Sequence, residues 1–83
     1  MRVNVLFFAS LAEEVGCRAL ELTLTTGSLV GLRSALSERL NAEQLSALED
    51  DQIRMARNQE LWDGEGALAD GDELAFLPPV TGG

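Results

Sequence analysis

The residues with the clearest chemical potential lie at the end of the sequence, in the tail Pro78-Pro79-Val80-Thr81-Gly82-Gly83. Two prolines keep the root of this tail extended, and two glycines remove every side chain from its tip. A peptide of this shape can be threaded into a narrow slot, where a β-carbon would clash, and can present its carboxylate to chemistry inside. The tail is therefore either a frayed end or a segment that enters a partner. The Pro-Pro lead after a compact domain favours the second interpretation, with the carboxylate of Gly83 as the reacting group.

The rest of the sequence offers little catalytic machinery. It contains no histidine, which excludes a Ser-His-Asp triad, a Cys-His pair and any histidine-ligated metal site. The acidic run Glu49-Asp50-Asp51 supplies too few ligands for a metal by itself, and a solvated surface loop is the better interpretation. We therefore expect no metal site and no acid–base machinery in this chain.

The single cysteine, Cys17, has no cysteine partner for an internal disulfide or a metal cage. A free thiol is typical of a reducing compartment. Because Cys17 follows Gly16 and precedes Arg18, a modestly activated nucleophile is conceivable. A small apolar residue in a turn is the interpretation that general experience favours.

The charge of the chain limits its partners. Fourteen acidic residues against six arginines give a net charge of −8. Nothing in such a chain could neutralise a run of phosphates, so we expect no binding to nucleic acid. The charge instead favours a partner with a basic surface, although acidity also serves simply to keep a small domain soluble. Lysine is absent, so an activated C-terminal acyl group would meet no internal lysine amine; a genome that favours arginine codons is the alternative cause.

The length of 83 residues allows one domain. The 46% hydrophobic content is typical of a globular protein. The longest apolar run, Val5–Ala9, is far too short to span a membrane, and Arg2 alone is a poor basic start for a secretory signal. We expect a cytoplasmic protein with no membrane contact.

The first part of the chain predicts two strands around a short helix. Alternation predicts a strand over about residues 2–8, and Leu6 with Phe8 on its second face predicts that both faces are covered. Ser10 and Glu13 have the spacing of a capping box at a helix start, and Gly16 can end that helix. Alternating leucines over residues 20–24 predict a second strand with one solvated face.

The middle of the chain predicts the main helix. Ser28 is a candidate N-cap, and leucines at 29, 32, 36 and 40 form one apolar stripe. Gly31 weakens this helix by about 1 kcal/mol relative to alanine unless it permits close packing. Asn41 followed by Gln44 predicts a second capped turn that reaches about Leu48.

The last part predicts strands. Alternation over residues 53–57 is followed by a turn at Asn58-Gln59 and a short Leu61-Trp62 strand. The final strand covers residues 74–77 and must end at the two prolines. This order predicts an α+β roll with one helix packed across one face of a sheet, and parallel first and last strands if these are neighbours. We assign residues 1–77 to the domain and 78–83 to the extended tail.

Strand parity also predicts a docking surface. Leu74 and Phe76 share the face of the last strand that we assign to the core, so Leu77 lies on the opposite face, at the root of the tail. Phe8 and Leu61 are expected to join Leu77 in an apolar patch, and such a patch on a monomer usually has a partner. The alternative is that these three side chains are simply buried.

Three segments carry a resemblance to a known family. The run 70–83, DGDELAFLPPVTGG, closely resembles the C-terminus of molybdopterin synthase small subunits, a family of ubiquitin-like sulfur carriers. Val5–Ala9 resembles that family's first strand, and Arg57-Asn58-Gln59 matches its Asn-Gln signature. The resemblance covers the whole chain, although the middle helices match only in pattern. It implies a β-grasp fold, with a mixed sheet of about four to five strands packed on one main helix.

The resemblance also implies a mechanism. An E1-like activating enzyme would use ATP to adenylate Gly83, and sulfide from a persulfide donor would displace AMP to leave a thiocarboxylate. The tail would then enter the large subunit of molybdopterin synthase, which supplies the catalytic side chains for sulfur transfer to a pterin precursor. Gly83 would carry the sulfur, Gly82 would give clearance, and Pro78, Pro79, Val80 and Thr81 would set the path of the tail. No cofactor would be stably bound, and whether such a subunit counts as an enzyme stays open.

Other carriers share the Gly-Gly end. Sulfur carriers for thiamine, cysteine or transfer-RNA thiolation are alternatives, as is a ubiquitin-like modifier that delivers its end to lysines of target proteins. The Pro-Pro-Val-Thr lead favours the molybdenum-cofactor branch. An acidic adaptor domain with an idle tail is the remaining alternative.

Overall fold

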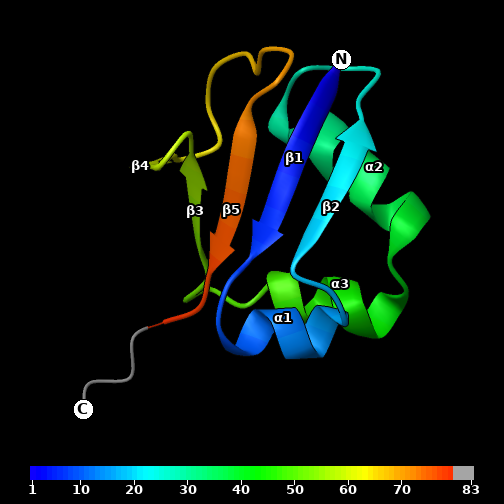
Figure 1. Ribbon diagram of the computed structural model, residues 1–83, viewed down its shortest axis with the longest axis vertical. Coiled ribbons are helices and arrows are strands. Elements are labelled where there is room, and N and C mark those ends of the chain that lie inside the picture. Colours follow the sequence, from blue (N-terminus) through cyan, green and yellow to red (C-terminus); the bar gives the residue numbers. More distant parts are fainter. Residues whose placement is uncertain (80–83) are drawn as a thin grey trace.

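The computed structural model describes residues 1–79, which form five strands and three helices around one core (Figure 1). In chain order the elements are β1 (Arg2–Phe7), α1 (Ser10–Val15), β2 (Ala19–Thr23), α2 (Leu29–Arg39), α3 (Ala42–Leu48), β3 (Arg54–Arg57), β4 (Glu60–Leu61) and β5 (Glu73–Leu77). In this described part, no helix is long and apolar enough to cross a membrane.

The strands form a single mixed sheet in the order β2-β1-β5-β3-β4. β1 pairs antiparallel with β2 and parallel with β5, while β3 pairs antiparallel with both β5 and β4. Figure 1 shows α2 behind the sheet, and α1 and α3 together beneath the ends of β1 and β2. The first and last strands are therefore parallel neighbours, and the predicted β-grasp architecture is confirmed.

The core lies between the sheet and the helices. Leu74 and Phe76 of β5 are buried there, as the strand parity predicted, and the leucine stripe of α2 packs against them. Burial of each such side chain stabilises the fold by roughly 1.5–3 kcal/mol relative to exposure. The sheet contributes Val3, Val5, Phe7, Leu22, Leu74 and Phe76 to this core, and the helices contribute Leu11, Val15, Leu32, Ala35 and Leu36.

Two of the predicted helix starts are confirmed. Ser28 caps α2, where its hydroxyl accepts a hydrogen bond from the Gly31 backbone N–H at 3.2 Å. Asn41 and Gln44 form a reciprocal capping box at the start of α3, with both hydrogen bonds at 2.8 Å. Gly31 is buried against Thr26, whose carbonyl a β-carbon would overlap, so close packing explains the glycine inside α2.

The predicted capping box at the first helix is wrong. Ser10 is already helical, and the N-cap is Ala9, which makes no side-chain capping bond. The chain leaves β1 so sharply, with Ala9 at φ 50°, that backbone carbonyls take over the capping role. The N–H groups of Leu11 and Ala12 donate to the carbonyls of Phe8 and Ala9.

Two further expectations need correction. β1 is central, but its second face is not fully covered: Leu6 is half-buried and Phe8 is 45% exposed, because the helical layer lies on the other face. The short strand is Glu60–Leu61 rather than Leu61-Trp62. Its start is set by the predicted two-residue turn, in which Asn58 and Gln59 both have positive φ angles.

Candidate functional site at the root of the tail

The candidate site lies where the chain leaves the sheet. β5 ends at Leu77, and Pro78 and Pro79 follow it at the end of the sheet opposite to Met1 (Figure 1). We call Leu77, Pro78 and Pro79 the tail root. The other predicted tail residues, Val80, Thr81, Gly82 and Gly83, lie outside the described residues.

The tail root is held in place by the strands on both sides of β5. On one side, Phe7 of β1 is in register with Phe76, and the Phe8 backbone N–H donates to the Phe76 carbonyl at 3.2 Å. On the other side, Arg54 of β3 is in register with Leu77. Because β5 is an inner strand with a buried face, the point at which the tail leaves the domain is fixed by the core.

The three predicted patch residues all lie on the sheet face away from α2 and α3, which we call the open face. Leu77 is half-buried, Phe8 is 45% exposed and Leu61 is 75% exposed. Leu61 and Leu77 line one hollow of about 470 Å³ together with Pro78 and Pro79. The structure therefore brings Leu61 next to the tail root. We call Phe8, Leu61 and Leu77 the tail-root patch.

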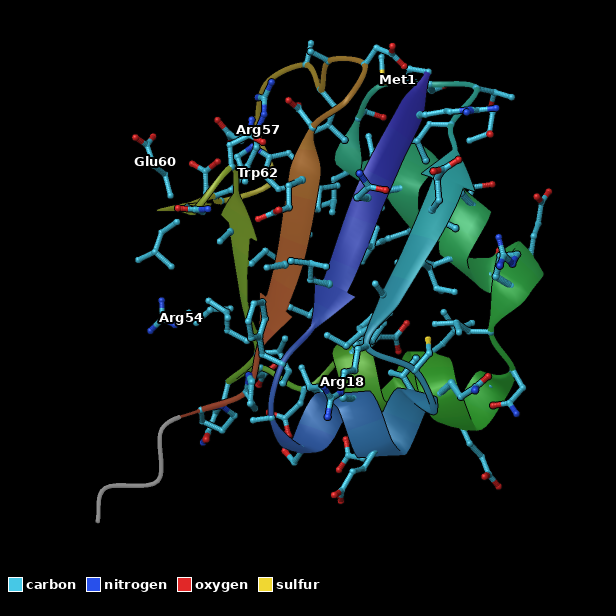
Figure 2. The ribbon with its side chains drawn as sticks, viewed as in Figure 1. Met1, Arg18, Arg54, Arg57, Glu60 and Trp62 are labelled. Carbon is cyan, nitrogen blue, oxygen red and sulfur yellow. The ribbon has the colours of Figure 1, made fainter. Side chains whose placement is uncertain are left out.

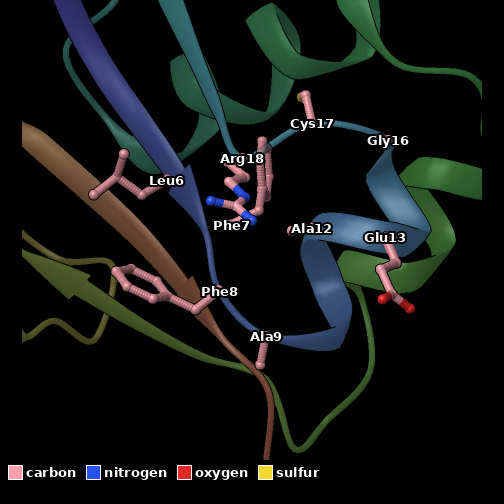
Figure 3. Close-up of a pocket in the computed structure, with 9 residues that line it drawn as sticks. All are labelled: Leu6, Phe7, Phe8, Ala9, Ala12, Glu13, Gly16, Cys17 and Arg18. Carbon is pink, nitrogen blue, oxygen red and sulfur yellow. The ribbon is translucent and has the colours of Figure 1, made fainter.

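Phe8 lies at the side of this patch, at the end of β1. Figure 3 shows its ring directed toward β5, at the edge of a second hollow of about 730 Å³ between β1 and α1. Cys17 and Arg18 line this second hollow as well. Cys17 is half-buried and packs against the core, which is the environment of a small apolar residue.

The floor of the tail-root patch consists of residues that were not predicted from the sequence. Leu6, Ala75, Ala56 and Leu61 are successive partners across β1, β5, β3 and β4, and they form one row on the open face. The two alanines are buried even though they are on this face. The parity argument that placed Leu77 could have found Ala75, two residues earlier, but Ala56 required the register of β3 against β5.

The Arg57-Asn58-Gln59 signature has a structural position at the other end of β5. The buried carboxylate of Asp72 accepts hydrogen bonds from the Ala69 N–H, the Asn58 side chain and Arg57 Nε, at 2.8, 3.0 and 2.8 Å. Asn58 in turn exchanges two hydrogen bonds with the backbone of Glu73. These contacts tie the β3–β4 turn to the start of β5. The hydrogen bond from Ala69 is the main cause that lowers the pKa of Asp72, and Asn58 adds to it.

The described residues hold no cluster with metal-binding geometry. Among residues 1–79, no three histidine, cysteine, aspartate or glutamate side chains gather in a group that could hold a metal ion. The acidic run 49–51 lies in the loop between α3 and β3, where Asp50 accepts a hydrogen bond from the Gln52 N–H at 2.8 Å.

Comparison with known proteins gives a consistent result. The model of the ThiS family matches residues 5–83. The chain is 42% identical to the molybdopterin synthase sulfur carrier subunit of Escherichia coli, over 98% of this chain and 99% of that protein. Its structure is similar to that of SAMP1 from Haloferax volcanii, with a TM-score of 0.82 and 31% identity over the full length of both chains.

A second solved structure is a complex. It contains subunits 1 and 2 of molybdopterin-converting factor from Helicobacter pylori. One chain of this complex matches the present chain, over the full length of each, with a TM-score of 0.72 and 31% identity. The resemblance to molybdopterin synthase small subunits is thereby confirmed at the level of sequence and fold. Because the family model matches residues 5–83 and the Escherichia coli relative aligns with 98% of the chain, this chain belongs to the ThiS family.

Proposed function

We propose that this chain is the sulfur carrier of a molybdopterin synthase and that the carboxylate of Gly83 carries the sulfur. The observation that carries this proposal is the 42% identity, over nearly the full length, to a protein named as that sulfur carrier subunit. The position of the tail root supports it, because Pro78 and Pro79 follow Leu77 directly at the end of the sheet.

The proposed chemistry converts a poor acyl group into a sulfur donor. An ATP-dependent activating enzyme joins the Gly83 carboxylate to AMP and releases pyrophosphate. A thiol that is oxidised to a disulfide releases sulfide from a persulfide donor, and this sulfide attacks the acyl carbon, so that a C–S bond replaces the C–O bond to AMP. The resulting thiocarboxylate transfers its sulfur to a pterin precursor inside the large subunit, and water restores the Gly83 carboxylate.

In this proposal the domain positions the tail. The four residues that follow Pro79 span at most about 13–14 Å when extended. An extended tail would therefore place the reacting carbon well away from the sheet, within the partner. The side chains that move protons during adenylation and sulfur transfer are accordingly expected in the activating enzyme and in the large subunit.

We also propose that the tail-root patch docks the domain while the tail is inserted. Phe8 and Leu61 are large apolar side chains that remain exposed in the isolated domain, and Leu77 lies between them on β5. The Helicobacter pylori complex pairs a relative of this chain with a second subunit, which supports a large-subunit partner. The activating enzyme must receive the same tail, so the two partners are expected to compete for one surface.

The decisive experiment is intact-mass analysis. The purified chain is incubated with ATP, an activating enzyme and a sulfur source, and the expected product has one oxygen of its carboxylate replaced by sulfur. Loaded chain mixed with the large subunit and the pterin precursor should then yield molybdopterin and the original mass. Loading without any transfer to the precursor would contradict the assignment to molybdopterin synthase.

A second candidate function is protein modification. It is favoured by the structural similarity to SAMP1, the small archaeal modifier protein 1 of Haloferax volcanii. A modifier would form an amide between Gly83 and lysines of other proteins. Detection of such conjugates, together with absence of sulfur transfer to the pterin precursor, would favour this candidate.

A further inference from the structure

Arg54 places a positive charge beside the tail root of this acidic chain. Although the net charge is −8, the residue in register with Leu77 on the neighbouring strand is Arg54. Arg54 is exposed, and it lines the same hollow as Leu61, Leu77 and the two prolines. Figure 2 shows its side chain directed outward from β3, on the side of the sheet from which the tail leaves.

Arg54 shares with Arg18 and Arg33 the lack of an ion pair or side-chain hydrogen bond within residues 1–79, and of these three it alone lines the hollow at the tail root. Arg57 pairs with Asp72 at 2.8 Å, Arg2 pairs with Glu21 at 3.5 Å, and Arg39 donates to the Glu21 carbonyl at 3.3 Å. The guanidinium of Arg54 has no acidic group within 4.0 Å in this part of the chain.

Asp51 is the acidic residue that lines the hollow at the tail root. It lines the hollow together with Arg54 but does not form an ion pair with it among the described residues. Arg54 therefore offers five N–H donors beside the apolar patch, and Asp51 lowers but does not cancel the local positive charge.

We assign Arg54 a role at the tail root rather than at the reacting carbon. Gly83 follows the tail root by four residues, so an extended tail carries the carboxylate up to about 13–14 Å beyond Pro79. Arg54 lies instead beside the tail root, where the domain surface must meet the rim of any slot that receives the tail.

We propose that Arg54 binds a carboxylate of the large subunit at the rim of the slot that receives the tail; this inference rests on the proposed function. Arginine suits this role because its planar guanidinium can form two parallel hydrogen bonds to one carboxylate. Because the rest of the domain is acidic, it favours a basic partner surface. A carboxylate within that surface would pair with Arg54 in one orientation of docking. Arg54 thereby fixes how the domain is turned when Leu77 and the tail enter.

The test compares two variants with the same change of charge. Arg54→Glu reverses the charge at the tail root, whereas Arg39→Glu reverses a charge in the last turn of α2. Binding of each purified chain to the purified large subunit is measured at low and at high salt. We expect Arg54→Glu to weaken binding at least tenfold, Arg54→Gln to weaken it less, and Arg39→Glu to change it less than twofold.

The salt dependence and a rescue give two further readouts. The loss for Arg54→Glu should shrink as ionic strength rises, because an ion pair at the rim is screened. Replacement of the matching large-subunit carboxylate by arginine should restore binding of Arg54→Glu and weaken binding of the wild-type chain. Melting temperatures of all variants should stay close to wild type, since Arg54 and Arg39 are exposed.

The outcomes separate this inference from the proposed function. If Arg54→Glu binds as tightly as wild type, or loses no more than Arg39→Glu, the role of Arg54 is overturned while sulfur loading and transfer by the wild-type chain still stand. If the wild-type chain itself fails to bind the large subunit, the proposed function fails and this inference fails with it.

Discussion

The rings of Phe7 and Phe76 stack on each other, with centroids 5.8 Å apart and planes inclined by 16°. Phe7 is the last residue of β1, and Phe76 precedes Leu77 by one residue in β5. This pair therefore joins the two parallel strands at the end of the sheet from which the tail leaves. It couples the packing of the core directly to the position of the tail root.

Truncation of Phe76 should destabilise the fold. We expect Phe76→Ala to lower the free energy of unfolding by about 3–5 kcal/mol, because it removes the stacked ring and leaves a cavity beneath β5. Urea denaturation at low temperature measures this loss. A loss below about 1 kcal/mol would show that Phe76 contributes little to the core.

Changes at the end of the tail should abolish sulfur loading without affecting stability. A chain that lacks Gly83, or one extended beyond it, has no glycine carboxylate at the required position, so we expect no thiocarboxylate by intact mass. Gly82→Val should block entry into a narrow slot because of its added side chain. The melting temperature is the control, and normal loading of the chain without Gly83 would refute the role of this residue.

Replacement of Leu77 should prevent docking while the domain stays folded. Leu77 is half-buried on the open face, and Leu77→Glu places a charge in the centre of the tail-root patch. We expect affinity for the large subunit to fall at least tenfold, which corresponds to about 1.4 kcal/mol. The same loss is expected for the activating enzyme.

Val30→Glu is the matched control for Leu77→Glu. Val30 is an apolar side chain that is 77% exposed, but it lies on α2 rather than on the open face. This variant should bind like wild type. If Leu77→Glu folds and binds with undiminished affinity, Leu77 is no part of the docking surface, and if it unfolds, Leu77 belongs to the core.

The Asp72 carboxylate should make stability depend on pH. Hydrogen bonds from Ala69 and Asn58 lower the pKa of Asp72 below its usual range in the folded chain. A carboxylate with a lowered pKa stabilises the fold above its unfolded-state pKa of about 4, and this contribution is lost as pH falls through the lower folded pKa.

Asp72→Asn tests this contribution. We expect the variant to be less stable than wild type by about 2 kcal/mol at pH 7, since a charged acceptor of three hydrogen bonds is lost. The difference should narrow at pH values below about 4. Thermal unfolding of both proteins between pH 7 and pH 3 provides the measurement, and a difference that is constant with pH would contradict the assignment.

Local pattern was sufficient for most elements of this chain. The sequence alone predicts features that depend on residues close together in the chain. These features are the alternation in β1 and β5, the leucine stripe of α2 and the Asn41–Gln44 capping box. The composition of the Pro-Pro-Val-Thr-Gly-Gly tail predicts a reacting carboxylate on Gly83, and this role stays a prediction.

Tertiary structure decided what lies beside what. The helical layer covers one face of β1, so Phe8 is exposed although its type suggested burial, and the sharp exit at Ala9 moved the first helix cap away from Ser10. Leu61 and Arg54 reach the tail root only because β3 pairs with β5 in one particular register. Strand register depends on contacts between residues far apart in the chain, and such contacts leave no periodic signal in the sequence.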